Sequence, residues 1–183
     1  MADDRPWYRE PETFIAIAAL IVSVSAVAVG IYEAALQRRH DRAEVWPHVE
    51  IGTYSSLHGV ALKVENNGIG PAVVKYAVAT VDGTPRRNWD DVVRALIGRT
   101  VGLTSNETIM ERGIRAGDNV TMLALPADSI PPKFWDWITR ASMTICYASV
   151  FDEYWIVSND HFGGSDHWRQ VSRCPPQPKN TDF

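Results

Sequence analysis

Two aspartate–histidine pairs, Asp160-His161 and Asp166-His167, hold the residues of this sequence that are best suited to metal chemistry. Carboxylate and imidazole groups are both good ligands for zinc and similar ions. Gly163 and Gly164 separate the pairs and would let a loop close around one ion. Asp, His, Gly and Ser are, however, also common turn residues. We therefore expect a solvent-exposed loop after the last strand, keep a metal site as the alternative, and predict no cofactor.

The two cysteines, Cys146 and Cys174, are the next reactive side chains. They would pair as a disulfide in an oxidising compartment and would stay free thiols in a reducing one. The sequence has no CxxC motif and no GxSxG nucleophile motif. Ser149, Asp152 and His161 are residue types that any sequence of this length supplies, so they do not define a catalytic triad. We expect a protein that is not an enzyme.

The clearest element in the chain is an uncharged apolar segment over residues 14–32. As a helix it would extend about 28 Å, close to the thickness of the hydrocarbon core of a bilayer. We predict an N-terminal tail over residues 1–13, a transmembrane helix over 14–36 and a helical stalk over 37–46, ended by Pro47. A cleaved signal peptide is the alternative, but its leader would be basic, whereas acidic residues predominate before this segment.

Arginines on either side of the apolar segment predict its orientation. Arg38, Arg39 and Arg42 follow it, whereas Arg5 and Arg9 precede it. Because Lys and Arg are enriched on the cytoplasmic side of a span, this small excess predicts a cytoplasmic domain at the inner (plasma) membrane. That compartment is reducing, so we expect the two cysteines to be free. The three arginines after the span also form a membrane-proximal basic cluster next to the lipid headgroups.

One face of the predicted span carries small residues, and a stripe of bulky residues that includes Val24 adjoins it. Small side chains let two helix backbones approach closely, which favours association inside a membrane. We therefore expect a membrane-protein partner or self-association in addition to the bilayer itself. The alternative is that an alanine-rich segment shows such a face by chance. The expected helix-packing residues are Ala19, Ser23, Ala26 and Gly30.

Residues 47–172 have the size of one globular domain. The chain is 45% hydrophobic and 22% charged, a composition that does not indicate disorder. Its net charge of −4 gives no sign of a basic surface, so we expect no nucleic-acid partner. The proline-rich tail over residues 173–183 is predicted to be disordered.

Alternating apolar residues predict that this domain is mainly β. In the clearest case, Val60, Leu62 and Val64 alternate with small or charged neighbours. Two short helices are expected between strands, over residues 89–97 and 132–140. The whole pattern predicts an antiparallel β-sandwich with these helices as insertions. The expected strands lie near residues 49–53, 60–65, 72–81, 108–111, 120–125, 143–150 and 154–157.

A turn-rich segment, Asn66-Asn67-Gly68-Ile69-Gly70-Pro71-Ala72, follows the second predicted strand. Gly68 and Gly70 can supply positive φ and proline fixes φ, so we expect a tight turn. Together with the single span, residues 37–42, Trp46-Pro47 and residues 146–155, it resembles a broad group of uncharacterised bacterial membrane-anchored proteins that carry an N-x-G-x-G-P-A turn. The resemblance implies an immunoglobulin-like fold and a bacterial inner membrane, and it implies no activity.

Two tryptophans on the second predicted helix bear on partner binding. Trp135 and Trp137 point about 200° apart on a helix, so both cannot face the core. Tryptophan is enriched in binding hot spots, and we expect the exposed one to contact a partner. The sequence as a whole predicts a membrane-tethered, non-enzymatic interaction module, an accessory or scaffold subunit of a membrane complex. The first alternative is a membrane-anchored ligand sensor or defence-type signalling component, and the second is a small metalloenzyme.

Overall fold

The computed structural model describes residues 11–179 and 181–183, except the side chains of Ala43 and Asn106. The chain divides into two compact units, Met1–Ala43 and Glu44–Phe183. We call the second unit the β domain and describe each unit by itself. The β domain includes the end of the predicted stalk and the predicted tail over residues 173–183. The predicted N-terminal tail lies mostly outside the described residues.

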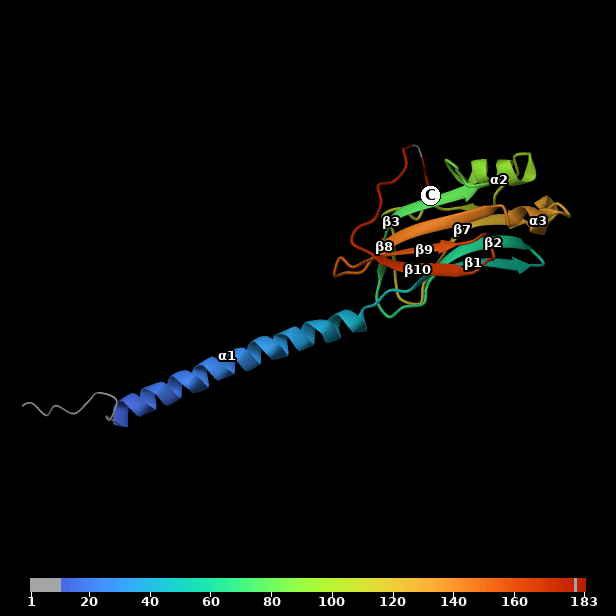
Figure 1. Cartoon of the computed structure of the whole chain (residues 1–183). Coiled ribbons are helices and arrows are strands. Elements are labelled where there is room, and N and C mark those ends of the chain that lie inside the picture. The colour runs from blue at the N-terminus through green and yellow to red at the C-terminus, as the bar shows by residue number, and fades with distance from the viewer. Residues whose placement is uncertain (1–10, 180) are drawn as a thin grey trace, which may run out of the picture. The chain divides into compact units, whose positions relative to one another are not determined.

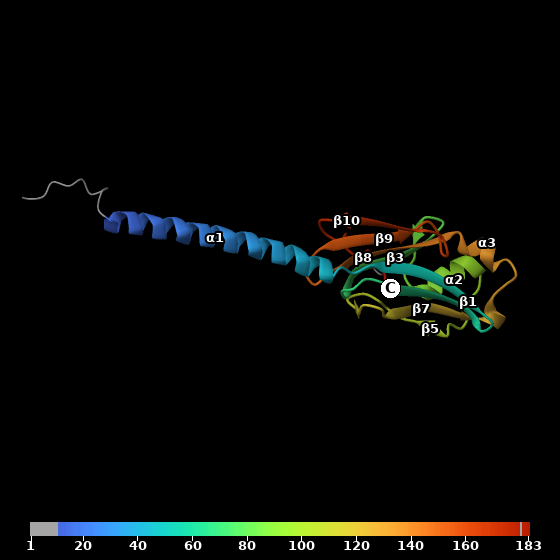
Figure 2. The same ribbon diagram turned by 90° about the horizontal axis from the view of Figure 1, so that it is seen from below.

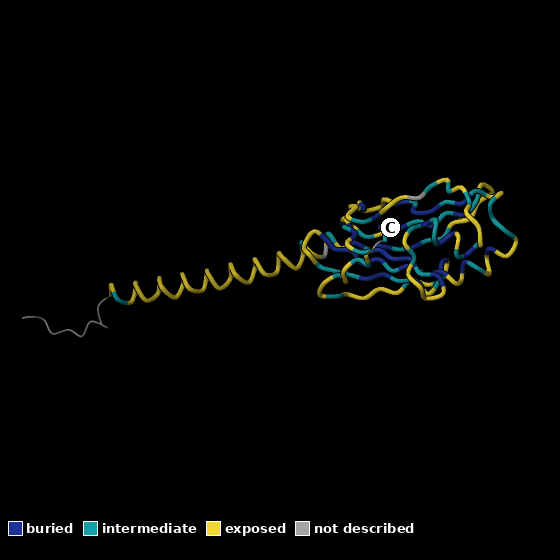
Figure 3. Tube along the Cα trace, turned by 90° about the horizontal axis from the view of Figure 1, so that it is seen from above, coloured by how far each residue is buried: buried dark blue, intermediate teal, exposed yellow. Residues whose placement is uncertain are grey.

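The described part of the first unit belongs to one long helix, α1 (Pro11–Glu44), whose last residue is counted with the β domain. The helix covers the predicted span and most of the predicted stalk (Figure 1). Proline is tolerated in a first turn, and Glu12 and Arg42 lie at the helix ends that favour their charges. Figure 3 shows that α1 is exposed along its apolar segment. The structure confirms an N-terminal helix that is long and apolar enough to cross a membrane.

The β domain is built from antiparallel strands that form two sheets (Figures 1 and 2). The strands are β1 (Val49–Ser56), β2 (Gly59–Asn66), β3 (Ala72–Val81), β4 (Thr84–Pro85), β5 (Ser105–Asn106), β6 (Gly113–Ile114), β7 (Asn119–Pro126), β8 (Ala141–Ala148), β9 (Tyr154–Asn159) and β10 (Asp166–Val171). The first sheet has the order β1-β2-β7-β5. The second has the order β10-β9-β8-β3-β4, with β6 paired to β3. The prediction of a mainly β domain with antiparallel sheets is confirmed.

Side chains from both sheets pack into one hydrophobic core. In β2, buried and half-buried residues alternate, so Val60, Leu62 and Val64 face the core as their spacing predicts. β8 has a more continuous buried run and lies between β9 and β3, in the interior of the second sheet. In β2 the apolar alternation of the sequence therefore fixes which face is buried.

Helical segments lie between strands at two places. α2 (Trp89–Ile97) follows β4; Asn88 Oδ1 accepts a hydrogen bond from Asp91 N at 3.0 Å, and Gly98 ends the helix with φ 77°. A 3-10 turn, η2 (Ala127–Ser129), and the helix α3 (Phe134–Ile138) lie between β7 and β8. α3 is shorter than predicted, because residues 132–133 form a turn. α2 buries its apolar face in the core, and α3 contributes Phe134 and Ile138.

Two stretches of the second half differ from the expected pattern. Residues 108–111, predicted as a strand, form an irregular segment between β5 and β6. Residues 166–171, where no strand was predicted and of which 166–167 were expected in a loop, form β10, which pairs with β9 from Asp166↔Asn159 to Val171↔Tyr154. β10 lies at a sheet edge and most of its side chains are exposed. Its sequence therefore lacks the apolar alternation that marks a half-buried strand.

The C-terminal segment packs on the β domain. Cys174 is bonded to Cys146 of β8. The Gln177 side chain accepts a hydrogen bond from Ala77 N at 3.1 Å and donates one to Ala77 O at 2.7 Å. Phe183 is fully buried in the hydrophobic core. The prediction of a disordered tail is therefore wrong for the described part of this segment, because single Cys, Gln and Phe side chains find specific partners that composition does not reveal.

Candidate functional site

The linker, residues 45–48, joins α1 to β1 and is hydrogen-bonded to the turn after β2. Trp46 O accepts hydrogen bonds from Ile69 N at 3.0 Å and from Gly70 N at 3.3 Å. His48 O accepts a hydrogen bond from Asn67 N at 2.8 Å. We call the linker and residues 66–72 the junction. The predicted turn motif thus holds the chain segment that follows the apolar helix.

The side chain of Asn66 lies at the centre of the junction and is fully buried. Its Oδ1 accepts hydrogen bonds from His48 N and Gly68 N, both at 3.1 Å. Its Nδ2 donates to Gly70 O at 2.8 Å and to Ile114 O at 3.0 Å. One amide therefore uses both of its acceptor sites and both of its donors, and it ties the linker, the turn and β6 together.

Gly68 and Gly70 are required by close packing. Neither has a positive φ, so the expectation that they supply one is wrong. A Cβ at Gly70 would lie 1.8 Å from Val45 O, and a Cβ at Gly68 would lie 2.3 Å from His48 N. These distances are far inside van der Waals contact. The linker can cross the turn only because these two positions carry no side chain.

Three rings lie next to one another at the junction: the Trp46 and His48 rings are tilted by 39° to each other, and the His48 and Trp168 rings are stacked at 28°. The ring centroids of Trp46 and His48 are 5.1 Å apart, and those of His48 and Trp168 are 4.7 Å apart. His48 Nε2 also lies 3.3 Å from Glu50 Oε1. The stack brings a residue of β10 against the linker, although the two are more than a hundred residues apart in the sequence.

Side chains of β10 also bond to the backbone of β1. Trp168 Nε1 donates to Val49 O at 2.7 Å, and Asp166 Oδ2 accepts a hydrogen bond from Ile51 N at 2.7 Å. An edge strand otherwise presents unpaired backbone groups that invite pairing with another chain. These bonds cover part of the outer edge of β1 and connect the two sheets.

A groove of about 260 Å³ lies beside β1 and carries negative charge. Glu50, Glu65 and Asp166 contribute carboxylates, and Tyr54 and Trp168 contribute rings. Burial is the main cause that raises the pKa of Asp166 above its ordinary value. The hydrogen bond with Glu65 is the main cause that raises the pKa of Tyr54. Three carboxylates would repel anions, including nucleic-acid phosphates, from this groove.

The two Asp-His pairs do not form a shared site. His167 Nε2 lies 3.0 Å from Asp160 Oδ1, whereas Asp166 bonds to the backbone of β1. His161 lies in the turn before β10, with its ring next to Gly164. Within residues 11–179 and 181–183, no group of three or more potential metal ligands comes together. The loop expectation holds for residues 160–165 and is wrong for residues 166–167, which belong to β10.

Cys146 and Cys174 form a disulfide bond, with their Cα atoms 5.7 Å apart. The expectation of two free thiols is therefore wrong. Cys146 is fully buried in β8, and the bond ties the segment after β10 to the second sheet. Closing a loop of this length contributes about 3–4 kcal/mol in the chain-entropy account. The wrong expectation followed from the orientation assigned to the helix.

The predicted helix-packing residues Ala19, Ser23, Ala26 and Gly30 are all exposed on α1. Ser23 Oγ donates to Ala19 O at 2.8 Å, so its hydroxyl is already satisfied inside the helix. Such a hydroxyl can face lipid or another helix at little cost. Apart from its chain neighbours and the backbone of the same helix turn, no described atom lies within 4 Å of a Cβ built at Gly30. The face is therefore open to an approaching helix.

The remaining candidates are surface residues. Arg38, Arg39 and Arg42 are exposed near the C-terminal end of α1. Trp135 is 51% exposed, whereas Trp137 packs partly against the core. The structure thus identifies Trp135 as the exposed member of the pair that the sequence left open.

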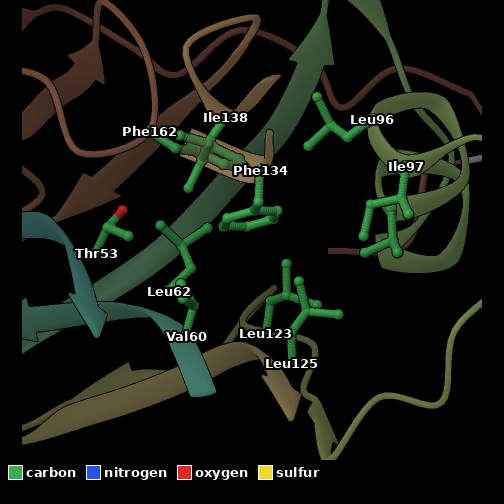
Figure 4. Close-up of a pocket in the computed structure, with 11 residues that line it drawn as sticks. Thr53, Val60, Leu62, Leu96, Ile97, Leu123, Leu125, Phe134, Ile138 and Phe162 are labelled. Carbon is green, nitrogen blue, oxygen red and sulfur yellow. The ribbon is translucent and has the colours of Figure 1, made fainter. Parts of the chain in front are cut away.

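A cavity of about 20 Å³ lies in the hydrophobic core between the sheets and the helices. Figure 4 shows Phe134, Leu62 and Leu123 pointing into it from α3, β2 and β7. Its lining is almost entirely apolar. Pockets for small-molecule ligands usually measure about 300–1,000 Å³. This space is a packing defect and gives no support to a ligand sensor.

Comparisons of the chain with protein-family models, with curated proteins and with solved structures found no match. The candidate site, the junction with its contacts to β10, is therefore described from its geometry alone. Sequence reasoning found the turn but missed the part that Asn66 plays in it, and it missed the contacts of β10 with β1. A signal for the first was present, because a polar residue stands at an inward-facing position at the end of β2.

Proposed function

We propose that this protein is a membrane-tethered, non-catalytic interaction module that serves as an accessory or scaffold subunit of a membrane complex. The observation that carries the proposal is the exposed apolar helix α1, followed directly by a linker that is hydrogen-bonded to the turn after β2. A linker fixed to its domain in this way suits a domain that must stay at a membrane surface. The open small-residue face of α1 and the exposed Trp135 are the surfaces offered to partners.

We further propose that the β domain is an immunoglobulin-like sandwich. Its strand orders, β1-β2-β7-β5 and β9-β8-β3-β4, correspond to the ABED and GFCC′ orders of that fold, with β10 as an addition. The shared core between the sheets supports the same assignment. The disulfide departs from the antibody pattern, because Cys146 on the strand that corresponds to F pairs with the C-terminal segment.

The β domain is proposed to lie on the oxidising, extracytoplasmic face of a bacterial plasma membrane. Disulfide bonds persist in oxidising compartments, and the Cys146–Cys174 bond supports that side. The arginine excess after the span favours the opposite side, but only by one charge, and whole domains are translocated largely regardless of charge. The bacterial assignment rests on the resemblance of the junction motif.

The test of this function is the composition of the complex that the full-length protein forms in its membrane. The tagged protein is extracted in a mild detergent, and the mass of the intact complex is measured. We expect another membrane protein, or a second copy of the chain, at fixed stoichiometry. A monomer accompanied only by proteins of low and variable yield would contradict the proposal.

A further inference from the structure

We propose that the β domain contacts the lipid surface through an apolar rim formed by Trp46, Ile69, Val150 and Phe151. The inference rests on the proposed membrane anchor and adds a second contact with the same bilayer. The partner is the lipid headgroup layer of the membrane.

The strand register places the four rim residues at one end of the β domain. Ile69 N donates to Trp46 O, and Ile69 lies in the turn that leads into β3. β3 begins beside the end of β8, with Val73 paired to Ala148. The other two rim residues follow β8 directly, in its turn to β9. The turn before β3, the turn after β8 and the linker therefore all lie at the same end of the sheets.

The rim residues are apolar, yet each exposes a large part of its side chain. Isolated exposed apolar residues are normal on protein surfaces, but a group at one end of a domain marks an interaction site. The exposed fractions are 46% for Trp46, 64% for Ile69, 55% for Val150 and 43% for Phe151.

The turn that carries two of these residues is held in place by Ser149. This residue is buried, and its Oγ accepts hydrogen bonds from Phe151 N at 3.1 Å and from Glu153 N at 3.4 Å. Ser149 N also donates to Glu153 O at 2.9 Å. A preformed apolar tip loses little conformational freedom when it binds. The turn therefore presents Val150 and Phe151 ready for contact.

Chain connectivity identifies lipid as the partner. Trp46 follows the last residue of α1, Glu44, after a single intervening residue. Helical residues 37–44, beyond the predicted span, extend about 12 Å, and the headgroup layer is about 5–7 Å thick on each side of a bilayer. An upright helix would therefore place the linker about 5–7 Å beyond the headgroups, a gap that tilting of the helix reduces. Tryptophan and other amphipathic rings favour that layer.

The test uses photocrosslinking in the full-length protein, reconstituted in phosphatidylcholine liposomes. The photoreactive residue p-benzoylphenylalanine replaces Phe151 in one variant and Ile69 in a second, so that the result does not depend on the folding of a single variant. A third variant carries it at Val24 within the predicted span. The matched control carries it at Leu57, which is 95% exposed in the β1–β2 turn at the opposite end of the sheets. Lipid adducts are identified by mass spectrometry.

We expect lipid adducts at Val24, at Phe151 and at Ile69, with several-fold lower yield at Leu57. Adducts at Val24 without adducts at Phe151 and Ile69 would overturn the rim contact and leave the anchor in place. Adducts to protein in place of lipid at both rim positions would also overturn it, in favour of a protein partner at this end. The absence of lipid adducts at Val24 would contradict the anchor itself.

Discussion

Asn66 makes four hydrogen bonds from one buried side chain, and all four partners are backbone groups: three belong to the junction and one, Ile114 O, belongs to β6. Removing such a side chain leaves buried donors and acceptors without partners, which costs more than the bonds contribute when formed. The neighbouring Asn67 is exposed and makes a side-chain bond to Glu50 at 2.8 Å. The two adjacent asparagines therefore form a natural pair for comparison.

The variant Asn66→Ala is expected to lower the free energy of unfolding by about 2–4 kcal/mol, because four backbone groups lose their partner. Thermal and urea unfolding of the full-length protein in detergent would measure this. Asn67→Ala serves as the control and should cost less than about 0.5 kcal/mol, as most exposed substitutions do. Similar small losses in both variants would show that the amide does not hold the junction.

At this scale the sequence identified the right residues for a partly wrong reason. Gly68 and Gly70 mark a turn, as expected. They are required there because a side chain at either position would clash with the backbone of the linker. Such a contact between residues 45–48 and 66–72 depends on the tertiary path of the chain, so local turn chemistry cannot reveal it. The disulfide bond of Cys174 could not be predicted for a similar reason, since it depends on how the segment after β10 returns to β8.

At the scale of elements, α1 is the feature with the clearest functional expectation. Its small-residue face is open, and Val24 lies in the bulky stripe beside it. Close approach of helix backbones drives association in lipid, where the hydrophobic effect between helices is absent. A large residue on the small face would hold the backbones apart.

Gly30→Leu is therefore expected to weaken any complex made through the helix, whereas Val24→Leu should leave it unchanged. Leucine is a better helix former than glycine by about 1 kcal/mol, so the first variant should keep its helix. Chemical crosslinking in native membranes would compare the two variants. Equal yields would mean that the small face reflects alanine content and that α1 serves only as a tether.

A long uncharged apolar run made α1 predictable and apolar alternation made β2 predictable, and the lack of such patterns explains which elements were missed. β10 has mostly exposed side chains and lies at a sheet edge, so no alternation marks it. β5 and β6 are two residues long and exist only through pairing with β7 and β3. Their positions follow from the assembled sheets, which lie beyond what a local pattern can specify.

For the whole molecule, the disulfide and the arginine count indicate opposite sides of the membrane. A one-charge excess gives a weak orientation signal, whereas disulfide bonds such as Cys146–Cys174 persist mainly in oxidising compartments. We therefore propose that α1 anchors the chain and that the β domain lies on the oxidising face. The proposed lipid contact of the apolar rim and the proposed association through the small face of α1 both depend on this anchoring.

The most direct test of that claim is cysteine labelling of the full-length protein in intact spheroplasts. One variant carries Leu57→Cys at the exposed β1–β2 turn, and another carries Ala2→Cys before the helix. A membrane-impermeant maleimide is added from outside, and both variants are labelled again after lysis as a control. We expect labelling of the Leu57→Cys variant before lysis and of the Ala2→Cys variant only after it. Labelling of the Ala2→Cys variant alone before lysis would place the β domain in the cytoplasm and contradict the account.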